Sequence, residues 1–75
     1  MPDRPTSHVL RSRLAINLAA ARARMGMTQE GLAEASGLGR TYVSEVERLK
    51  RNITLDVLER FGTALGVDPL DLLKP

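Results

Sequence analysis

The sequence contains no cysteine and no tryptophan, and its only aromatic residues are one tyrosine and one phenylalanine. A small secreted domain usually needs disulfide bonds, so the lack of cysteine favours a cytoplasmic protein. With no thiolate and a single histidine, His8, the chain lacks the side chains typical of a metal site, and we expect neither a metal nor another cofactor. Because aromatic residues are so few, leucine, alanine, valine and isoleucine must build the core.

Long apolar runs are also absent. No stretch approaches the roughly 20 apolar residues of a membrane-spanning helix, and the start of the chain does not have the pattern of a signal peptide. We therefore expect no membrane contact. At 75 residues the chain forms at most one domain with a modest core. It shows no nucleophile–base pair and no phosphate-binding loop, so we do not expect an enzyme.

Apolar residues do not alternate with period two anywhere, so no strand is predicted and the fold class is all-α. Apolar residues spaced by three and four, with threonine, glycine and proline at the boundaries, predict a compact bundle of five helices. We expect these helices at about residues 7–25, 28–36, 39–49, 54–65 and 68–73. Residues 1–7 are predicted to be a frayed segment, and residues 8–75 to be the folded domain.

Positive charge is clustered, although the net charge is only +2. Residues 1–27 carry five arginines and one acidic residue, and residues 48–51 read RLKR. Two basic clusters on a small domain indicate either a polyanionic partner or simply a solvated surface.

The stretch TQEGLAEASGLGRTYVSEVE, residues 28–47, is predicted to form two short helices joined by a turn. Gly37 suits the turn because glycine tolerates positive φ, and Ala33 is small enough for the two helices to pack closely. Val43 and Val46 would face the core. The second helix would then expose hydrogen-bonding side chains that can enter the major groove of DNA. These side chains are Arg40, Thr41, Ser44, Glu45 and Arg48.

With this motif and the later stretches RNITL and ALGVDPLDLL, the sequence resembles the phage-repressor (Cro/cI-type, or XRE) family of helix-turn-helix transcription regulators. The run RTYVSEVER followed by RN is similar to the controller proteins of restriction–modification systems. The resemblance implies a lambda-repressor-like fold and a homodimer that binds double-stranded DNA at a pseudo-palindromic operator. The alternatives are the antitoxin of a toxin–antitoxin pair and a phage-type repressor.

The resemblance also implies DNA contacts by individual residues. Gln29 and Tyr42 match positions that contact the DNA backbone, and Arg51 and Asn52 fall in the loop that flanks the phosphates. The recognition helix spans about residues 39–49. Its positions that read bases or neighbouring phosphates hold Arg40, Thr41 and Ser44, and Arg48 completes its exposed face.

Three further expectations concern the charged residues and the end of the recognition helix. Arg22 and Glu47 match a pair that forms an internal salt bridge between the first and third helices. Glu45 is an acid that faces a polyanion. It could accept a hydrogen bond from the amino group of cytosine, but we expect it instead to orient Arg48 or to make no contact with DNA. Leu49 departs from the family, since many members have glycine there.

The last predicted helix carries more apolar surface than so short an element can hide within one domain. We therefore expect a dimer interface at this end of the chain, although the same leucines could instead complete the core of the monomer. The candidate interface residues are Val67, Leu70, Leu72 and Leu73.

Overall fold

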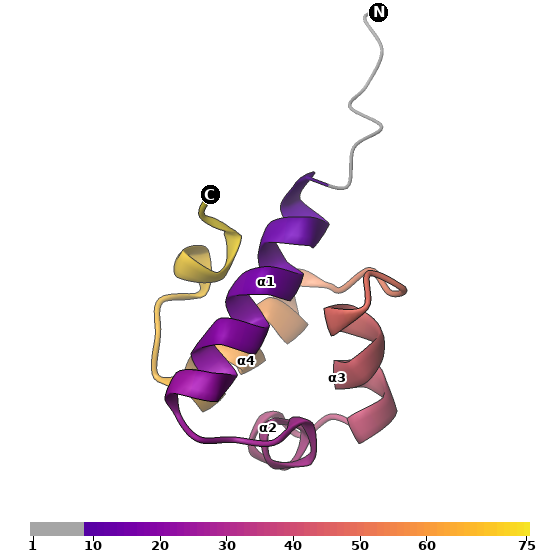
Figure 1. Cartoon of the computed structure of the whole chain (residues 1–75), viewed down its shortest axis with the longest axis vertical. Helices are drawn as coiled ribbons and strands as arrows, with labels where there is room; N and C mark the ends of the chain where they lie inside the picture. Colours follow the sequence, from indigo (N-terminus) through magenta and orange to yellow (C-terminus); the bar gives the residue numbers. More distant parts are fainter. Residues whose placement is uncertain (1–8) are drawn as a thin grey trace, which may run out of the picture.

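Residues 9–75 are described by a computed structural model, and this part of the chain is all-helical, as predicted (Figure 1). Its elements are the α-helices α1 (Val9–Arg24), α2 (Gln29–Ser36), α3 (Arg40–Glu47) and α4 (Leu55–Leu65), and the 3-10 helix η1 (Pro69–Leu73). The predicted frayed segment, residues 1–7, and His8 lie outside the described residues. Within residues 9–75, no helix has the length and hydropathy needed to cross a membrane.

The prediction of a fifth α-helix is wrong, because η1 takes its place. Asp68 begins this element: its side chain accepts a hydrogen bond from the N–H of Leu70 at 2.9 Å. The N–H of Asp71 then bonds to the carbonyl of Asp68 at 2.8 Å, which is the i→i+3 pattern of a 3-10 helix. Pro69 has no N–H, and an element of five residues is too short to repay the nucleation of an α-helix.

The ends of α2 and α4 follow the predicted capping residues. Thr28 and Thr54 have extended backbones, and their hydroxyl oxygens accept hydrogen bonds from the backbone of the first turn at 2.9 and 3.1 Å. Gly37 and Gly66 end the same two helices in the left-handed conformation, with φ of 74° and 68°. Local sequence therefore sets the limits of both helices.

The core draws on every helix of the described chain. Its members are Leu14, Leu18, Ala21, Leu32, Ala33, Val43, Val46, Leu58, Phe61, Leu65 and Leu72. Leu10 and Met25 continue the apolar stripe of α1 but are exposed, and so is Leu55 at the start of α4. These residues lie at or beyond the ends of the packed segments, where no other helix covers the stripe.

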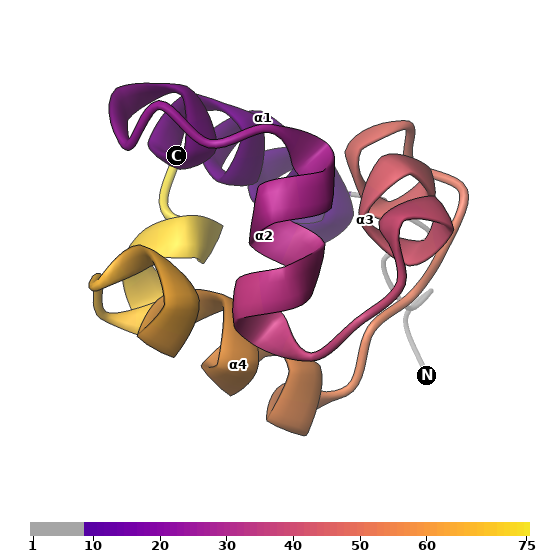
Figure 2. The ribbon, with the colours of Figure 1, turned by 90° about the horizontal axis from the view of Figure 1, so that it is seen from below.

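Figure 1 shows α3 and η1 on opposite sides of α1, and Figure 2 shows α2 crossing between α1 and α4 with α3 at one side. Helix α1 contacts α3, α4 and η1. The Asn17 side chain on α1 donates hydrogen bonds to the carbonyls of Leu72 at 3.1 Å and Lys74 at 2.8 Å. The end of the chain is thereby fastened to α1, on the side away from α3.

Gly62 is buried inside α4, a position where glycine normally weakens a helix. A Cβ atom at this position would stand 2.8 Å from Cγ of Pro69 and 3.0 Å from the carbonyl oxygen of Val67. The absent side chain therefore lets η1 pack directly on α4. This close approach between two successive elements is a contact that the apolar pattern does not reveal.

The connection from α3 to α4 begins with a strained residue. Leu49 has φ of 64°, and it is the only non-glycine residue with positive φ among residues 9–75. The N–H groups of Leu49 and Lys50 bond to the carbonyls of Val46 at 3.1 Å and Glu45 at 2.8 Å. This is the Schellman ending of a helix, in which glycine usually takes the left-handed position. Helix α3 consequently ends at Glu47, two residues earlier than predicted.

Replacing Leu49 with glycine should raise the free energy of unfolding by about 1 kcal/mol, because glycine adopts positive φ without the steric clash of a Cβ atom. Leu49→Ala is the matched control, since it removes the same exposed side chain but keeps the Cβ atom. Urea unfolding of the three proteins measures the difference. If Leu49→Gly is no more stable than Leu49→Ala, the left-handed residue carries no strain.

Candidate nucleic-acid interface

Helices α2 and α3 form a helix-turn-helix unit around a short glycine-containing turn. Gly37 ends α2, and the N–H of Leu38 bonds back to the carbonyl of Ala33 at 2.8 Å. Gly39 has an extended backbone and starts α3 directly. Ala33 itself is buried in the core, so its small side chain permits the close packing that the sequence predicts. The turn therefore redirects the chain within three residues.

Helix α3 has an anchored face and an open face. Val43 and Val46 are completely buried, which holds one side of the helix against the core. On the other side, the side chains of Arg40, Thr41, Ser44, Glu45 and Arg48 line one surface depression. The structure thus brings together the five side chains that the sequence predicts to be exposed on this helix.

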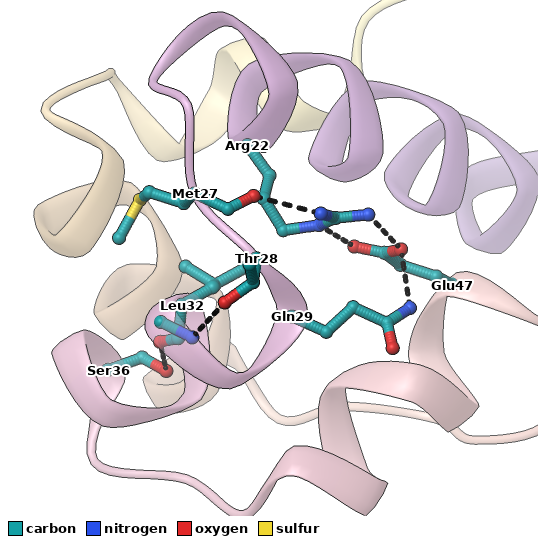
Figure 3. A network of polar contacts seen from close by, with 8 residues as sticks. Arg22, Met27, Thr28, Gln29, Leu32, Ser36 and Glu47 are labelled. Atoms are coloured by element: carbon teal, nitrogen blue, oxygen red, sulfur yellow. Dashed lines mark hydrogen bonds and ion pairs between the residues drawn. The ribbon is translucent and has the colours of Figure 1, made fainter.

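A network of polar contacts joins α3 to α1 and α2 (Figure 3). The Arg22 guanidinium donates through Nε and Nη2 to the two carboxylate oxygens of Glu47, at 2.9 and 3.0 Å. Its Nη1 donates to the carbonyl of Met27 at 2.9 Å, and the Gln29 side chain donates to Glu47 at 3.0 Å. The salt bridge between Arg22 and Glu47 is therefore present, and it extends to the start of α2.

This network is partly shielded from solvent. The Glu47 side chain is 8% exposed and that of Arg22 is 21% exposed. The hydrogen bonds to Glu47 raise the pKa of the Arg22 guanidinium above its usual value, so Arg22 stays positively charged. Two parallel charge-assisted hydrogen bonds fix both distance and orientation, which a single point charge could not do. The pair therefore adds a directional contact between α1 and α3 to the packing of the buried valines.

Arg51, a predicted phosphate contact, folds back onto α3. Its Nε and Nη2 atoms lie 2.9 and 2.8 Å from Oε1 of Glu45, and its guanidinium stands over the Tyr42 ring, 4.6 Å from the centroid. Glu45 therefore pairs with Arg51, and the expectation that it orients Arg48 is wrong. The turn at Leu49 reverses the chain, so that Arg51, not Arg48, returns to the carboxylate.

The start of α2 borders a second surface depression, which Arg22, Thr28, Gln29, Glu30 and Arg40 line. The N-terminal end of a helix carries free N–H groups and a partial positive charge, which favours an anion. Gln29 uses one donor of its amide for Glu47 and keeps a second. The position of Gln29 is thus compatible with the predicted contact between its side chain and the DNA backbone.

The four candidate dimer-interface residues separate into three groups. Leu72 is 2% exposed and belongs to the core, so it offers no surface to a partner. Leu70 is exposed, whereas Val67 and Leu73 are partly buried against the core. Leu72 therefore completes the core of the monomer, and the dimer interface stays a prediction for the other three residues.

An apolar groove, which the sequence analysis missed, lies where α1, the α3–α4 connection and η1 meet. It has a volume of about 220 Å³, and its apolar lining consists of Leu10, Leu14, Ile53, Leu55, Leu58 and Leu73. Arg51 and Asn52 form part of its polar edge, which links the groove to the end of α3. Leu55, 78% exposed, stands at its rim. Its exposure could not be anticipated, because it continues the buried stripe of α4.

The helix-turn-helix family matches residues 18–72. The chain belongs to this family, whose XRE-type members are DNA-binding transcription regulators. The fold agrees, since the crystal structure of the hypothetical transcription factor NHTF from Neisseria superposes with a TM-score of 0.88 at 44% identity. That match covers 100% of this chain and 84% of the other.

Controller proteins are among the similar proteins. Control protein C.BamHI from Bacillus amyloliquefaciens is 53% identical over 47 residues, which cover 63% of this chain and 58% of that protein. The crystal structure of the restriction-modification controller protein C.AhdI from Aeromonas hydrophila has a TM-score of 0.80 at 39% identity. It covers 83% of this chain and 94% of the other.

Replacing Glu47 with glutamine should lower the free energy of unfolding by about 2–3 kcal/mol, because the shielded Arg22 charge would lose its partner. Glu45→Gln is the control, since the Glu45–Arg51 pair is more exposed and contributes at most about 1 kcal/mol. Thermal unfolding of both variants measures the difference. Equal melting temperatures would show that the Arg22–Glu47 pair does not hold the two helices together.

Proposed function

We propose that this helix-turn-helix protein is a sequence-specific transcription regulator that binds double-stranded DNA as a homodimer at a pseudo-palindromic operator. The observation that carries this function is the division of α3 into an anchored face and an open polar face. Buried valines and the Glu47 pair fix the helix in position. The five open side chains can then meet base edges in a major groove, which admits a single helix.

The kind of regulator follows from its relatives. C.BamHI and C.AhdI are named as a control protein and a restriction-modification controller protein. We therefore propose that this chain is the controller of a restriction–modification system. A regulator of such a system would act on the promoter of neighbouring genes, without catalysing a reaction itself.

Arg40 is the residue best placed to read a base. It is exposed at the first position of α3 and lines both surface depressions, the one along α3 and the one at the start of α2. The N-terminal residues of a recognition helix are those that reach base edges most directly. An arginine there can donate two parallel hydrogen bonds to O6 and N7 of guanine, whereas Thr41 and Ser44 are suited to shorter contacts.

Arg40→Ala should weaken binding to the best operator by roughly 1–3 kcal/mol per half-site and abolish the preference for one base pair in each half-site. Arg60→Ala is the control, because this exposed arginine lies on α4 and lines neither depression. Selection of bound duplexes from a random pool, with wild type and both variants, measures affinity and preference together. An equal loss of affinity for all sequences would make Arg40 a phosphate contact only.

The dimer is proposed to form through the apolar groove. A two-fold dimer must place its recognition helices about 34 Å apart on one face of DNA. The groove adjoins Arg51 and Asn52 in the connection after α3, and Leu73 at the end of η1 is the one residue of that element that lines it. A partner seated on Leu55 and Leu73 would therefore lie close to this connection, and we expect it to keep both copies of α3 on the same side. Val67 and Leu70 do not line the groove, and we expect them to contribute less.

Leu55→Glu should give a folded monomer with weakened operator binding. In the dimer the new carboxylate would be buried in an apolar interface, which is costly, whereas in the monomer it would stay exposed to solvent. Ile16→Glu is the matched control, since Ile16 is 69% exposed on α1 and does not line the groove. Sedimentation at micromolar concentration measures the association. A monomeric wild type, or a Leu55→Glu variant that still dimerises, would contradict this interface.

A further inference from the structure

The open face of α3 carries one carboxylate, that of Glu45, among three arginines. Arg40 and Arg48 line the same depression, and Arg51 is bonded to the carboxylate directly. A carboxylate on a surface that meets DNA repels phosphates, so its presence weakens binding unless it has another role. The ion pair with Arg51 indicates what this role is.

Arg51 is held at two points. Arg51 Nε donates a hydrogen bond to Glu45 Oε1 at 2.9 Å, and Nη2 lies 2.8 Å from the same oxygen. This oxygen therefore occupies the edge of the guanidinium that would otherwise bind a phosphate with two parallel hydrogen bonds. The Tyr42 ring supports the guanidinium from one face at 4.6 Å. While this arrangement persists, Arg51 cannot bind a phosphate through the same edge.

The arrangement is nevertheless open to exchange. The side chains of Arg51 and Glu45 are 44% and 33% exposed, so solvent and a DNA phosphate can both reach the pair. Exposed ion pairs are weak, whereas an arginine–phosphate contact in a complex also releases a counterion. A DNA phosphate positioned beside Arg51 can therefore replace Glu45 as the partner of its guanidinium.

We propose that Glu45 is a specificity-determining residue that acts by withholding Arg51 from the phosphates of non-specific DNA. At the operator, base contacts by the rest of α3 hold a phosphate beside Arg51 long enough for the exchange. On other sequences α3 makes no such base contacts. The Glu45 carboxylate then stays bonded to Arg51 and also repels the DNA phosphates. This inference rests on the proposed function, since it presupposes that α3 faces DNA.

The test compares Glu45→Gln with wild type on the selected operator and on a random duplex. The variant should bind the random duplex roughly three- to tenfold more tightly at low salt, because Arg51 becomes available for one further phosphate. The plot of log K against log salt concentration should steepen by about 0.9 for this duplex. Operator affinity should rise less, so the ratio of specific to non-specific affinity falls.

Two controls separate this effect from a general change in charge. Glu59→Gln makes the same charge change at an exposed site on α4, and it should leave the ratio unaltered. In an Arg51→Ala background, Glu45→Gln should change binding to the random duplex much less than it does in wild type. An equal change in both backgrounds, or an effect no larger than that of Glu59→Gln, would overturn the proposal.

A measurement without DNA tests the pair itself. Tyr42 is the only tyrosine and the chain has no tryptophan, so its fluorescence reports on the guanidinium stacked against it. Arg51→Ala and Glu45→Gln should both change this emission, and Glu59→Gln should not.

If wild type binds operator and random duplex equally, the proposed function fails. If it discriminates but Glu45→Gln discriminates as well, only the role of Glu45 is rejected.

Discussion

The bidentate pair between Arg22 and Glu47 is the interaction on which the placement of the recognition helix depends. Helix α3 has only eight residues, and a helix this short is not stable by itself in water. Two buried valines attach it to the core. The pair adds a directional contact to α1, and because Gln29 and the carbonyl of Met27 join it, the network also connects the start of α2 to α3.

Two glutamates two residues apart on α3 have opposite surroundings. Glu47 faces inward, where its arginine partner is shielded, so it acts as a structural tie. Glu45 faces outward, where its arginine partner remains open to solvent and to phosphate. Since neighbouring residues on a helix point about 100° apart, a separation of two residues is enough to place them on different faces. Glutamate therefore holds α3 to α1 on the inner face of the helix, and in our proposal it favours the operator over other DNA on the outer face.

Local rules explain most of what could be predicted from the sequence. Threonine caps, the glycines at helix ends and apolar spacing predict α2, α3 and α4, and the family resemblance implies the Arg22–Glu47 pair. The failures involve packing between successive elements or backbone angles that the sequence disfavours. The packing of η1 on Gly62 is of the first kind. The return of Arg51 to Glu45 depends on positive φ at Leu49, and leucine is among the residues least expected to adopt it.

The strain at Leu49 is best understood together with the residues that follow it. A left-handed residue ends α3 sharply and reverses the chain, and only this reversal brings Arg51 over Tyr42 and within reach of Glu45. The Schellman hydrogen bonds and these side-chain contacts oppose the steric cost, so the conformation persists without glycine. Since the Arg51 side chain is 44% exposed, DNA that displaces it from these contacts would also loosen the support of the strained turn. Recognition of DNA and the conformation of the α3–α4 connection are therefore expected to be coupled through Arg51.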